Sequence, residues 1–341
     1  MDKVKNIAGN AVLGLILTLT AATGYADSVK PVKSVKGKLS VMILGSGGPL
    51  PPMGRASSSY LIFTDGKPRI LMDAGGGSYG KLSASGAVIK DLDIVLLSHL
   101  HIDHTADLSA FVKAMYFQSK GAGVMRTAPI NIYGPGANGK PFPNTKIAQY
   151  PSTKEYVDGH YHKETGVQRY LNIFAKAISA GEFAYTAHDI VPAQTKGIST
   201  VYDKDGLVIK AVGVVHGPVP SLAYRIEYGG ASIVFSGDTN SKTDNMEKIA
   251  NGADLLIYDT AIMDNIPDVT KNPADKVFFA LHTTPSRMGE VASKSNVKKL
   301  LLSHITPITQ PRLDEVKTIV KGKGFKGEIA VAEDLKVYNV K

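Results

Sequence analysis

The sequence of 341 residues contains no cysteine and no tryptophan. The absence of cysteine excludes disulfide bonds, thiolate ligands to a metal and a cysteine nucleophile. The absence of tryptophan leaves aromatic contacts to 15 tyrosines and 10 phenylalanines. Hydrophobic residues make up 43% and charged residues 20%, which is typical of a globular protein. This composition excludes a disordered chain, a fibrous repeat and a polytopic membrane protein.

Long runs of lysine or arginine are also absent, although the net charge is +9. Residues 1–38 carry +4 of this charge, so +5 remains on residues 39–341. Such a mild excess favours an anionic substrate, but it falls short of the basic patch that is typical of nucleic-acid-binding domains. We therefore do not expect nucleic acid as a partner.

The N-terminal stretch has the pattern of a cleavable signal peptide. Lys3 and Lys5 precede an apolar run of 12 residues, 11–22, which is too short to span a bilayer. Gly24 and Ala26 then provide the small residues of a cleavage site. We expect a signal peptide over residues 1–26, a basic linker over 27–38, and a periplasmic or secreted protein that has no membrane contact after cleavage. An N-terminal anchor or a buried helix is the alternative.

Short apolar segments that end in glycine, proline or aspartate dominate the rest of the chain. They predict strands over residues 39–44, 58–63, 69–72, 93–97, 130–133, 207–215, 222–228, 232–236 and 255–258. Helical spacing predicts helices over residues 105–117, 168–178, 242–250, 286–293 and 313–320. Residues 137–200 are less regular and are expected to form an insertion or a lid. Two β-rich halves with outer helices predict an α/β fold, a four-layer αβ/βα sandwich, over residues 39–341.

Three of the nine histidines lie in the segment 98–104, Ser-His-Leu-His-Ile-Asp-His. On an extended strand end, His99, His101 and Asp103 alternate onto one face, whereas His104 falls out of phase. Neighbouring residues therefore point at two adjacent positions, which suits two metal ions about 3.5–4 Å apart. Nitrogen and oxygen ligands indicate Zn²⁺, with manganese or iron as alternatives.

Three later polar residues each follow an apolar strand. They are His216, Asp238 and His304. One such residue alone would be taken for a turn residue or a buried histidine, but the repetition at four strand ends changes that interpretation. The pattern predicts one metal site at one edge of the sheets.

The sequence resembles the metallo-β-lactamase superfamily, in the branch similar to tRNase Z. The matching motifs include GSGGP (45–49), RASSSYLIF (55–63), SHLHIDHTADL (98–108), VVHGPVPSLAYRIE (214–227), FSGDT (235–239), LHTTPSRMGEVA (281–292) and LLSHITP (301–307). The resemblance implies that one metal is held by His99, His101 and His216. It implies a second metal held by Asp103, His104 and His304, with Asp238 bridging the two. It also makes His282 an additional catalytic histidine.

Two features depart from this branch. The expected signal peptide conflicts with tRNA processing, and no compact basic arm for tRNA is found. The acidic residue ahead of the catalytic histidine is a further departure, because the branch usually has a glutamate there and the best match here is Asp259. Exported relatives of this kind include arylsulfatase-like enzymes and phosphodiesterases.

The function expected from these observations is an exported binuclear metal-dependent hydrolase of phosphoric or sulfuric esters, phosphodiesterase or arylsulfatase-like, acting on a small anionic ester. A lactonase or β-lactamase on the same fold is an alternative, and so is a tRNA 3′-processing endonuclease if the leader is not cleaved. A non-catalytic nucleic-acid or metal-binding protein is the third class. A homodimer is left open.

The expected mechanism uses a hydroxide that bridges two divalent ions, because two ions lower the pKa of a shared water toward ~7. Asp103 is expected to orient that hydroxide and accept its proton. His282 would protonate the leaving oxygen, Asp259 would orient His282, and Asp73 would support the metal-binding loop.

We expect the mature protein to begin at Asp27, because the residues at 24 and 26 fit a signal-peptidase site. Mass-spectrometric mapping of the N-terminus of protein isolated from its native cells checks this. A chain that begins at Met1 or Asp2 in the soluble intracellular fraction would contradict the expected export.

Overall fold

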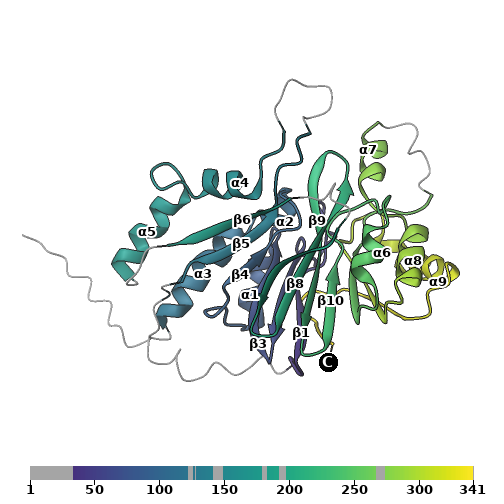
Figure 1. Cartoon of the computed structure of the whole chain (residues 1–341), viewed down its shortest axis with the longest axis horizontal. Helices are drawn as coiled ribbons and strands as arrows, with labels where there is room; N and C mark the ends of the chain where they lie inside the picture. The colour runs from purple at the N-terminus through teal and green to yellow at the C-terminus, as the bar shows by residue number, and fades with distance from the viewer. Residues whose placement is uncertain are drawn as a thin grey trace, which may run out of the picture.

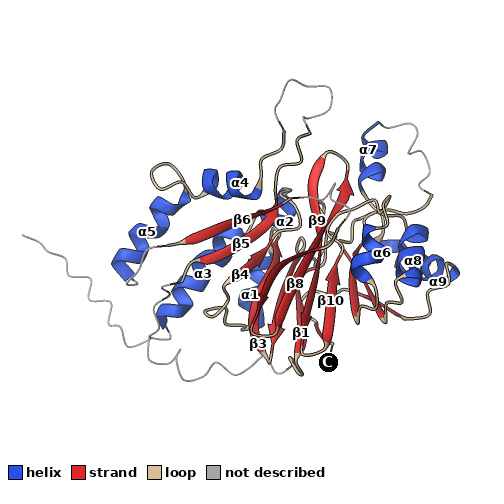
Figure 2. Cartoon of the chain, in the orientation of Figure 1, coloured by secondary structure: helices blue, strands red, loops and turns tan. Residues whose placement is uncertain are grey.

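The computed structural model describes residues 34–121, 126, 128–140, 149–178, 183–191, 197–265 and 273–340. The expected signal peptide and most of the basic linker lie outside these residues. The described residues fold around two seven-stranded sheets (Figures 1 and 2).

The first sheet contains strands mainly from the N-terminal half. In spatial order they are β14 (Val337–Asn339), β1 (Leu39–Gly45), β2 (Ser59–Thr64), β3 (Lys67–Ala74), β4 (Ile94–Leu96), β5 (Ile130–Pro135) and β6 (Tyr185–Ile190). Strands β14 to β3 pair antiparallel, and β3 to β6 pair parallel. The central strands are buried on both faces, which explains their continuous apolar sequences.

The second sheet repeats this arrangement with the C-terminal half. In spatial order its strands are β13 (Glu328–Val331), β12 (Lys299–Ser303), β11 (Leu255–Asp259), β10 (Ala231–Phe235), β9 (Val219–Tyr228), β8 (Leu207–His216) and β7 (Ser199–Lys204). Strands β7 to β10 pair antiparallel, and β10 to β13 pair parallel. Each half therefore combines an antiparallel meander with a parallel portion.

Helices cover the outer face of each sheet, so the predicted four-layer αβ/βα sandwich is confirmed. Beside the first sheet lie α1 (Ser78–Ser85), α2 (Ile102–Thr105), α3 (Leu108–Gly121), α4 (Thr153–His160) and α5 (Val167–Ile178). Beside the second lie α6 (Asn245–Ala250), α7 (Pro273–Leu281), α8 (Pro285–Lys294), the 3₁₀ turn η1 (Gln310–Arg312) and α9 (Leu313–Gly322). One apolar core fills the space between the sheets, and each sheet has one further core between its outer face and its helices.

The parallel portions determine where a site can form. Parallel strands end at the same edge of a sheet, and ligands are commonly bound outside that edge. The residues that follow β4, β10 and β12, and the last residue of β11, therefore meet at one edge shared by both sheets. Strand β8 runs in the same direction as β10, because both pair antiparallel with β9.

The helix predicted over residues 105–117 is found as α3, which begins only at Leu108, and the separate short helix α2 precedes it. The break comes at Asp107, whose backbone N–H donates to the Ala74 carbonyl over 2.9 Å, and whose carboxylate accepts from the Tyr79 N–H over 2.9 Å. These contacts tie the break to the end of β3. They also separate the short helix that carries Asp103 and His104 from the longer one behind it.

The segment 137–200 contains more regular structure than its sequence indicates. Helix α4 begins with a capping box, in which Glu155 N–H donates to the Ser152 hydroxyl and Ser152 N–H donates to the Glu155 carboxylate. Strands β6 and β7 form the outer edges of the two sheets. The lid role of this segment stays a prediction.

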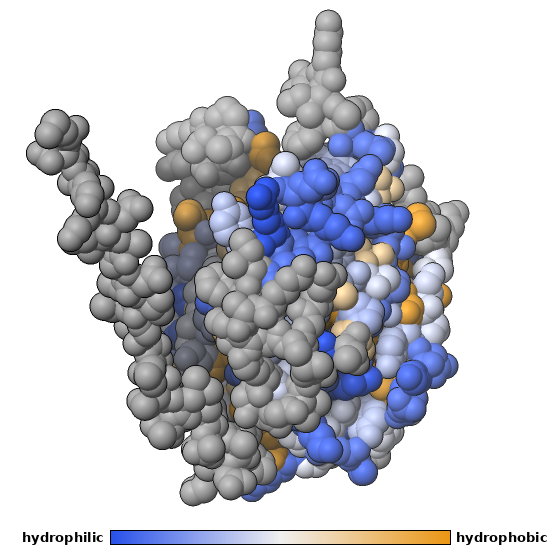
Figure 3. Space-filling model, turned by 90° about the vertical axis from the view of Figure 1, so that its left-hand side faces the viewer, coloured by the Kyte–Doolittle hydropathy of each residue, from blue (hydrophilic) through white to orange (hydrophobic). Residues whose placement is uncertain are grey.

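On the face seen in Figure 3, the described side chains are largely hydrophilic, and the apolar ones form scattered patches. Among the described residues, every helix is too short or too polar to cross a membrane. The large apolar clusters are therefore internal, between the layers.

Replacement of Ile233 by alanine is expected to lower the free energy of unfolding by about 2–5 kcal/mol, because this side chain is fully buried between the sheets. Chemical denaturation measured by circular dichroism checks the value. The control is Leu50→Ala, at a side chain that is 72% exposed, where a change within about 0.5 kcal/mol is expected. Equal losses for both variants would contradict the assigned core.

Candidate active site

The structure brings the predicted donor residues together at one edge of the two sheets. His99 follows β4, His216 ends β8, Asp238 follows β10 and His304 follows β12. Helix α2 begins directly after His101 and contributes Asp103 and His104. Six of the seven side chains are buried, and His101 is partly exposed.

A first cluster consists of His99, His101 and His216. His101 Nδ1 lies 2.9 Å from His99 Nε2 and 3.3 Å from His216 Nε2. Burial is the main cause that lowers the pKa of His99 and His101, and it lowers the pKa of His216 to about 4. Neutral imidazoles are the form that binds a metal ion, so this cluster is suited to a cation at neutral pH.

A second cluster consists of Asp103, His104, Asp238 and His304, whose ligand atoms all lie within 4.8 Å of one another. Asp103 Oδ2 is 3.4 Å from His104 Nε2 and 3.3 Å from His304 Nε2. Burial alone would lower the pKa of the two histidines. The neighbouring carboxylates outweigh burial, led by Asp238, and raise the pKa of His304 to about 10 and that of His104 well above its usual range.

Asp238 lies between the two clusters. Its Oδ2 is 3.8 Å from His99 Nε2 and 3.8 Å from His216 Nε2, while the same oxygen is 3.2 Å from His304 Nε2. Burial would raise the pKa of this carboxyl, but the surrounding histidines hold it well below its usual range. The group is therefore a buried anion that faces donors on both sides, as the bridging role implied by the resemblance requires.

Hydrogen bonds behind the donors hold their rings in place. Asp73 Oδ2 is 2.8 Å from His104 Nδ1, and Ser98 donates to Asp73 through its N–H and its hydroxyl over 2.7 and 2.8 Å. The Leu281 carbonyl accepts from His216 Nδ1 over 3.0 Å. Contacts of this kind select the ring tautomer and leave Nε2 free as a ligand atom.

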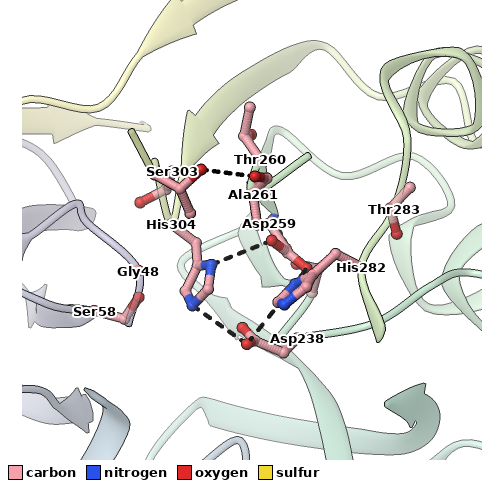
Figure 4. A network of polar contacts seen from close by, with 12 residues as sticks. Gly48, Ser58, Asp238, Asp259, Thr260, Ala261, His282, Thr283, Ser303 and His304 are labelled. Carbon is pink, nitrogen blue, oxygen red and sulfur yellow. Dashed lines mark hydrogen bonds and ion pairs between the residues drawn. The ribbon is translucent and has the colours of Figure 1, made fainter. Parts of the chain in front are cut away.

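Asp259 contacts two histidines at once (Figure 4). Its Oδ2 accepts from His282 Nδ1 over 2.7 Å, and its Oδ1 lies 3.3 Å from His304 Nδ1. His282 Nδ1 is 4.0 Å from Asp238 Oδ2, so the His282–Asp259 pair lies directly beside the second cluster. This is the contact expected if Asp259 orients His282.

Two residues at the site have left-handed backbones, with φ values of 55° at Asp73 and 56° at His304. A backbone of this kind costs about 1–3 kcal/mol in a residue other than glycine, and it persists only where the surrounding structure imposes it. Backbone strain therefore occurs at one candidate donor, His304, and at Asp73, which supports the donor His104.

The donor set fits divalent metal ions. His104 Nε2 is buried and has no hydrogen-bond partner among the described residues, although a buried ring nitrogen normally has one. It points into a group of two carboxylates and a second imidazole. A metal ion would satisfy that nitrogen and neutralise the carboxylates.

Some contributors were missed by sequence reasoning. Ser241 contacts the hydroxyls of Tyr258 and Thr283 over 2.6 and 2.7 Å and so ties the loop after Asp238 to the one after His282. In the sequence, only the position of Ser241 in the same loop as Asp238 could have indicated this role. Arg287 supports the same loop, because its Nε donates to the Ser241 carbonyl over 2.9 Å and its guanidinium pairs with Glu247.

Comparisons with known proteins agree with the fold. The model described as "Metallo-beta-lactamase superfamily" matches residues 52–117, and "Beta-lactamase superfamily domain" matches residues 159–305. Ribonuclease Z from Mycobacterium bovis (strain BCG / Pasteur 1173P2) is 29% identical over 303 residues, which cover 87% of this chain and 96% of that protein. Ribonuclease Z from Mycobacterium marinum is 27% identical over 303 residues, which cover 87% of this chain and 97% of that protein.

Solved structures share the fold. YhfI from Bacillus subtilis, a metallo-beta-lactamase fold protein, aligns with a TM-score of 0.60 and 22% identity, over 89% of this chain and 99% of that chain. The short form of human tRNase Z aligns with a TM-score of 0.59 and 22% identity, with the same coverage of both chains.

The two superfamily models together match more than half of the chain, so the chain belongs to the metallo-β-lactamase superfamily. Its similarity to the ribonuclease Z proteins fits the tRNase Z-like branch. It is a metal-dependent hydrolase that acts on ester bonds.

The expectation that nucleic acid is not a partner is wrong, because relatives that match along most of the chain are named ribonuclease Z. The absence of long lysine or arginine runs describes only how charge is arranged along the sequence, not on the folded surface. A nucleic-acid-binding surface can be assembled from residues that are distant in sequence, so the absence of runs does not exclude one.

We expect the purified protein to bind about two divalent ions per chain. Asp238→Ala should lose metal from both clusters, because its carboxylate faces both. His282→Ala, the matched control at the same edge, should keep its metal content. Elemental analysis of protein that is folded by circular dichroism checks this. Equal metal loss in the two variants would make His282 a ligand and contradict the assignment.

Proposed function

We propose that the chain is a phosphodiesterase that cleaves RNA, with the 3′ region of a tRNA precursor as its substrate. This proposal takes the place of the exported ester hydrolase expected from the leader, and it requires that the leader is not cleaved. The observation that carries this proposal is the position of the His282–Asp259 pair, with His282 Nδ1 4.0 Å from the carboxylate that faces both donor clusters. The near full-length similarity to ribonuclease Z proteins supports RNA as the substrate.

The metal ions of this centre are proposed to be two Zn²⁺ ions, because the donors are imidazole nitrogens and carboxylate oxygens without any thiolate. His99, His101 and His216 would hold one ion. Asp103, His104 and His304 would hold the other, and Asp238 would contact both. When bound, the ions supply hydroxide at neutral pH and stabilise the negative charge of the phosphate oxygens.

Asp103 is the group proposed to orient the attacking oxygen and accept its proton. Its carboxylate is buried, and burial alone would raise its pKa, but His104 and His304 hold that pKa far below its usual range. The carboxylate is therefore ionised at neutral pH and able to accept a hydrogen bond. Its position at the start of α2 is fixed by the contacts that join α2 to the end of β3.

His282 is proposed to give a proton to the leaving oxygen of the RNA. Its Nδ1 donates to Asp259, so Nε2 is the nitrogen that remains available to the substrate. The contact with Asp259 fixes the orientation of the ring. General-acid help of this kind contributes about 10²–10⁴-fold to the rate.

The proposed substrate is tested with a tRNA precursor that carries a 3′ trailer. The metal-loaded protein should cut the precursor near the end of the mature tRNA, and chelation should abolish cleavage. Gel analysis of the end-labelled RNA locates the cut. Hydrolysis of bis(4-nitrophenyl) phosphate or an aryl sulfate without any cleavage of the RNA would overturn the proposed substrate.

His282→Ala should lower kcat on RNA by about 10²–10⁴-fold and have a much smaller effect on bis(4-nitrophenyl) phosphate. The reason is that nitrophenolate leaves without needing a proton, whereas a ribose oxygen needs one. Rates on both substrates at equal metal content make the comparison. The control is His188→Ala, whose ring packs against Tyr133 outside the donor clusters. Equal losses on both substrates would mean that His282 binds the substrate instead.

A further inference from the structure

The loop of residues 45–49, which we name the glycine loop, lies against the donor His304. A Cβ atom on Gly48 would come within 2.8 Å of His304 Cε1, so the imidazole packs directly on the glycine backbone. Gly48 N–H donates to the Ile305 carbonyl over 3.0 Å, and Ile305 N–H donates to the Ser46 carbonyl over 2.9 Å. The loop therefore holds both the ring of His304 and the backbone that follows it.

The glycine loop is held in turn by a carboxylate from the C-terminal end of the chain. Asp334, between β13 and β14, accepts from the Ser46 N–H over 3.0 Å and from the Ser46 hydroxyl over 2.6 Å. Its other oxygen accepts from the Ala56 N–H over 2.7 Å. The side chain of Asp334 is only 6% exposed, so these contacts are sheltered from water.

Two cations complete this arrangement. Lys81 Nζ lies 3.1 Å from Asp334 Oδ2 and donates to the Gly54 carbonyl over 3.0 Å. Arg55 donates to the Ser46 hydroxyl and to the Ala332 carbonyl, each over 2.6 Å. A buried carboxylate needs such partners, because an unpaired buried charge is strongly unfavourable. The two cations also link the chain after the glycine loop, at Gly54 and Arg55, to the chain before β14, at Ala332 and Asp334.

His304 needs an external restraint of this kind. Its backbone is left-handed, with a φ of 56°, which is uncommon for residues other than glycine. Its ring must also present Nε2 to the second donor cluster while Nδ1 faces Asp259. The glycine loop supplies a surface against the ring and hydrogen bonds beside the strained residue.

We propose that Asp334 is a positioning residue for His304, and that it acts by holding the glycine loop against the imidazole. The inference rests on the two-ion centre of the proposed function but not on its RNA substrate. Asp334 would thereby set the affinity of the second donor cluster for its ion. The three-histidine cluster, whose members do not contact this loop among the described contacts, should be unaffected.

The test is a titration of metal-free protein with Co²⁺, followed by visible absorption and repeated with Zn²⁺ against a chromophoric chelator. Asp334→Asn should lower the affinity for one of the two ions by about tenfold. This is the lower end of the effect seen when a group that supports a metal ligand is removed. The other ion should change by less than about twofold. Gly48→Ala, which pushes directly on the His304 ring, should weaken the same ion and so identifies its absorption bands.

The matched control is Asp254→Asn. Asp254 accepts from the Ser232 N–H over 2.8 Å and the Ser232 hydroxyl over 3.3 Å, and it pairs with Lys298 over 2.6 Å. It therefore makes the same kinds of contact as Asp334, but in the hairpin and loop at the opposite ends of the strands. Both ions should bind this variant as they bind the wild type.

Each outcome decides the proposal. Wild-type affinity for both ions in Asp334→Asn, or equal weakening of both ions, would overturn it. If Asp334→Asn does not fold, Ser46→Ala removes the hydroxyl's contacts with Asp334 and Arg55 but keeps the backbone N–H contact. Unchanged binding of both ions in that variant would also overturn the proposal. A wild-type protein that binds fewer than two ions would instead refute the metal centre of the proposed function.

Discussion

The contacts of the buried Asp238 carboxylate with histidines from both sheets organise this edge of the molecule. An anion at this depth is stable only with positive or hydrogen-bonding partners nearby, and the chain supplies them from both sheets. His99 and His104 come from the N-terminal half, and His216 and His304 from the C-terminal half. The strand directions, the short helix α2 and the strained backbone at His304 all serve to bring these groups to one carboxylate.

The central strands and the donors could be predicted from the sequence for one common reason. A strand that is buried on both faces is a continuous apolar run, so a polar residue directly after it marks a strand end at the edge of the sheet. His216 and His304 were identified in this way. His282 has no such mark. Asp259 does follow an apolar run, but only the resemblance to a known family gave either residue a role.

Other parts of the structure could not be predicted because their sequence patterns are ambiguous. Strands β6 and β7 lie at the sheet edges and are partly exposed, so they lack a continuous apolar run. Ser98 and Asp334 are short polar residues next to strands, and the sequence does not distinguish a turn residue from one that supports a metal ligand. Asp334 also acts on Ser46, which is 288 residues away in the sequence, so local patterns contain no information about the contact.

The pairing of the two halves has a consequence for how the protein holds together. Each donor cluster takes side chains from both halves, so an ion bound there joins the two sheets in the manner of a reversible cross-link. Any ligand that binds only the folded state stabilises it by mass action. The stability of the packing between the two sheets therefore depends on the concentration of metal around the protein. When metal is scarce, the contact between the two halves is the part of the structure that is weakened first.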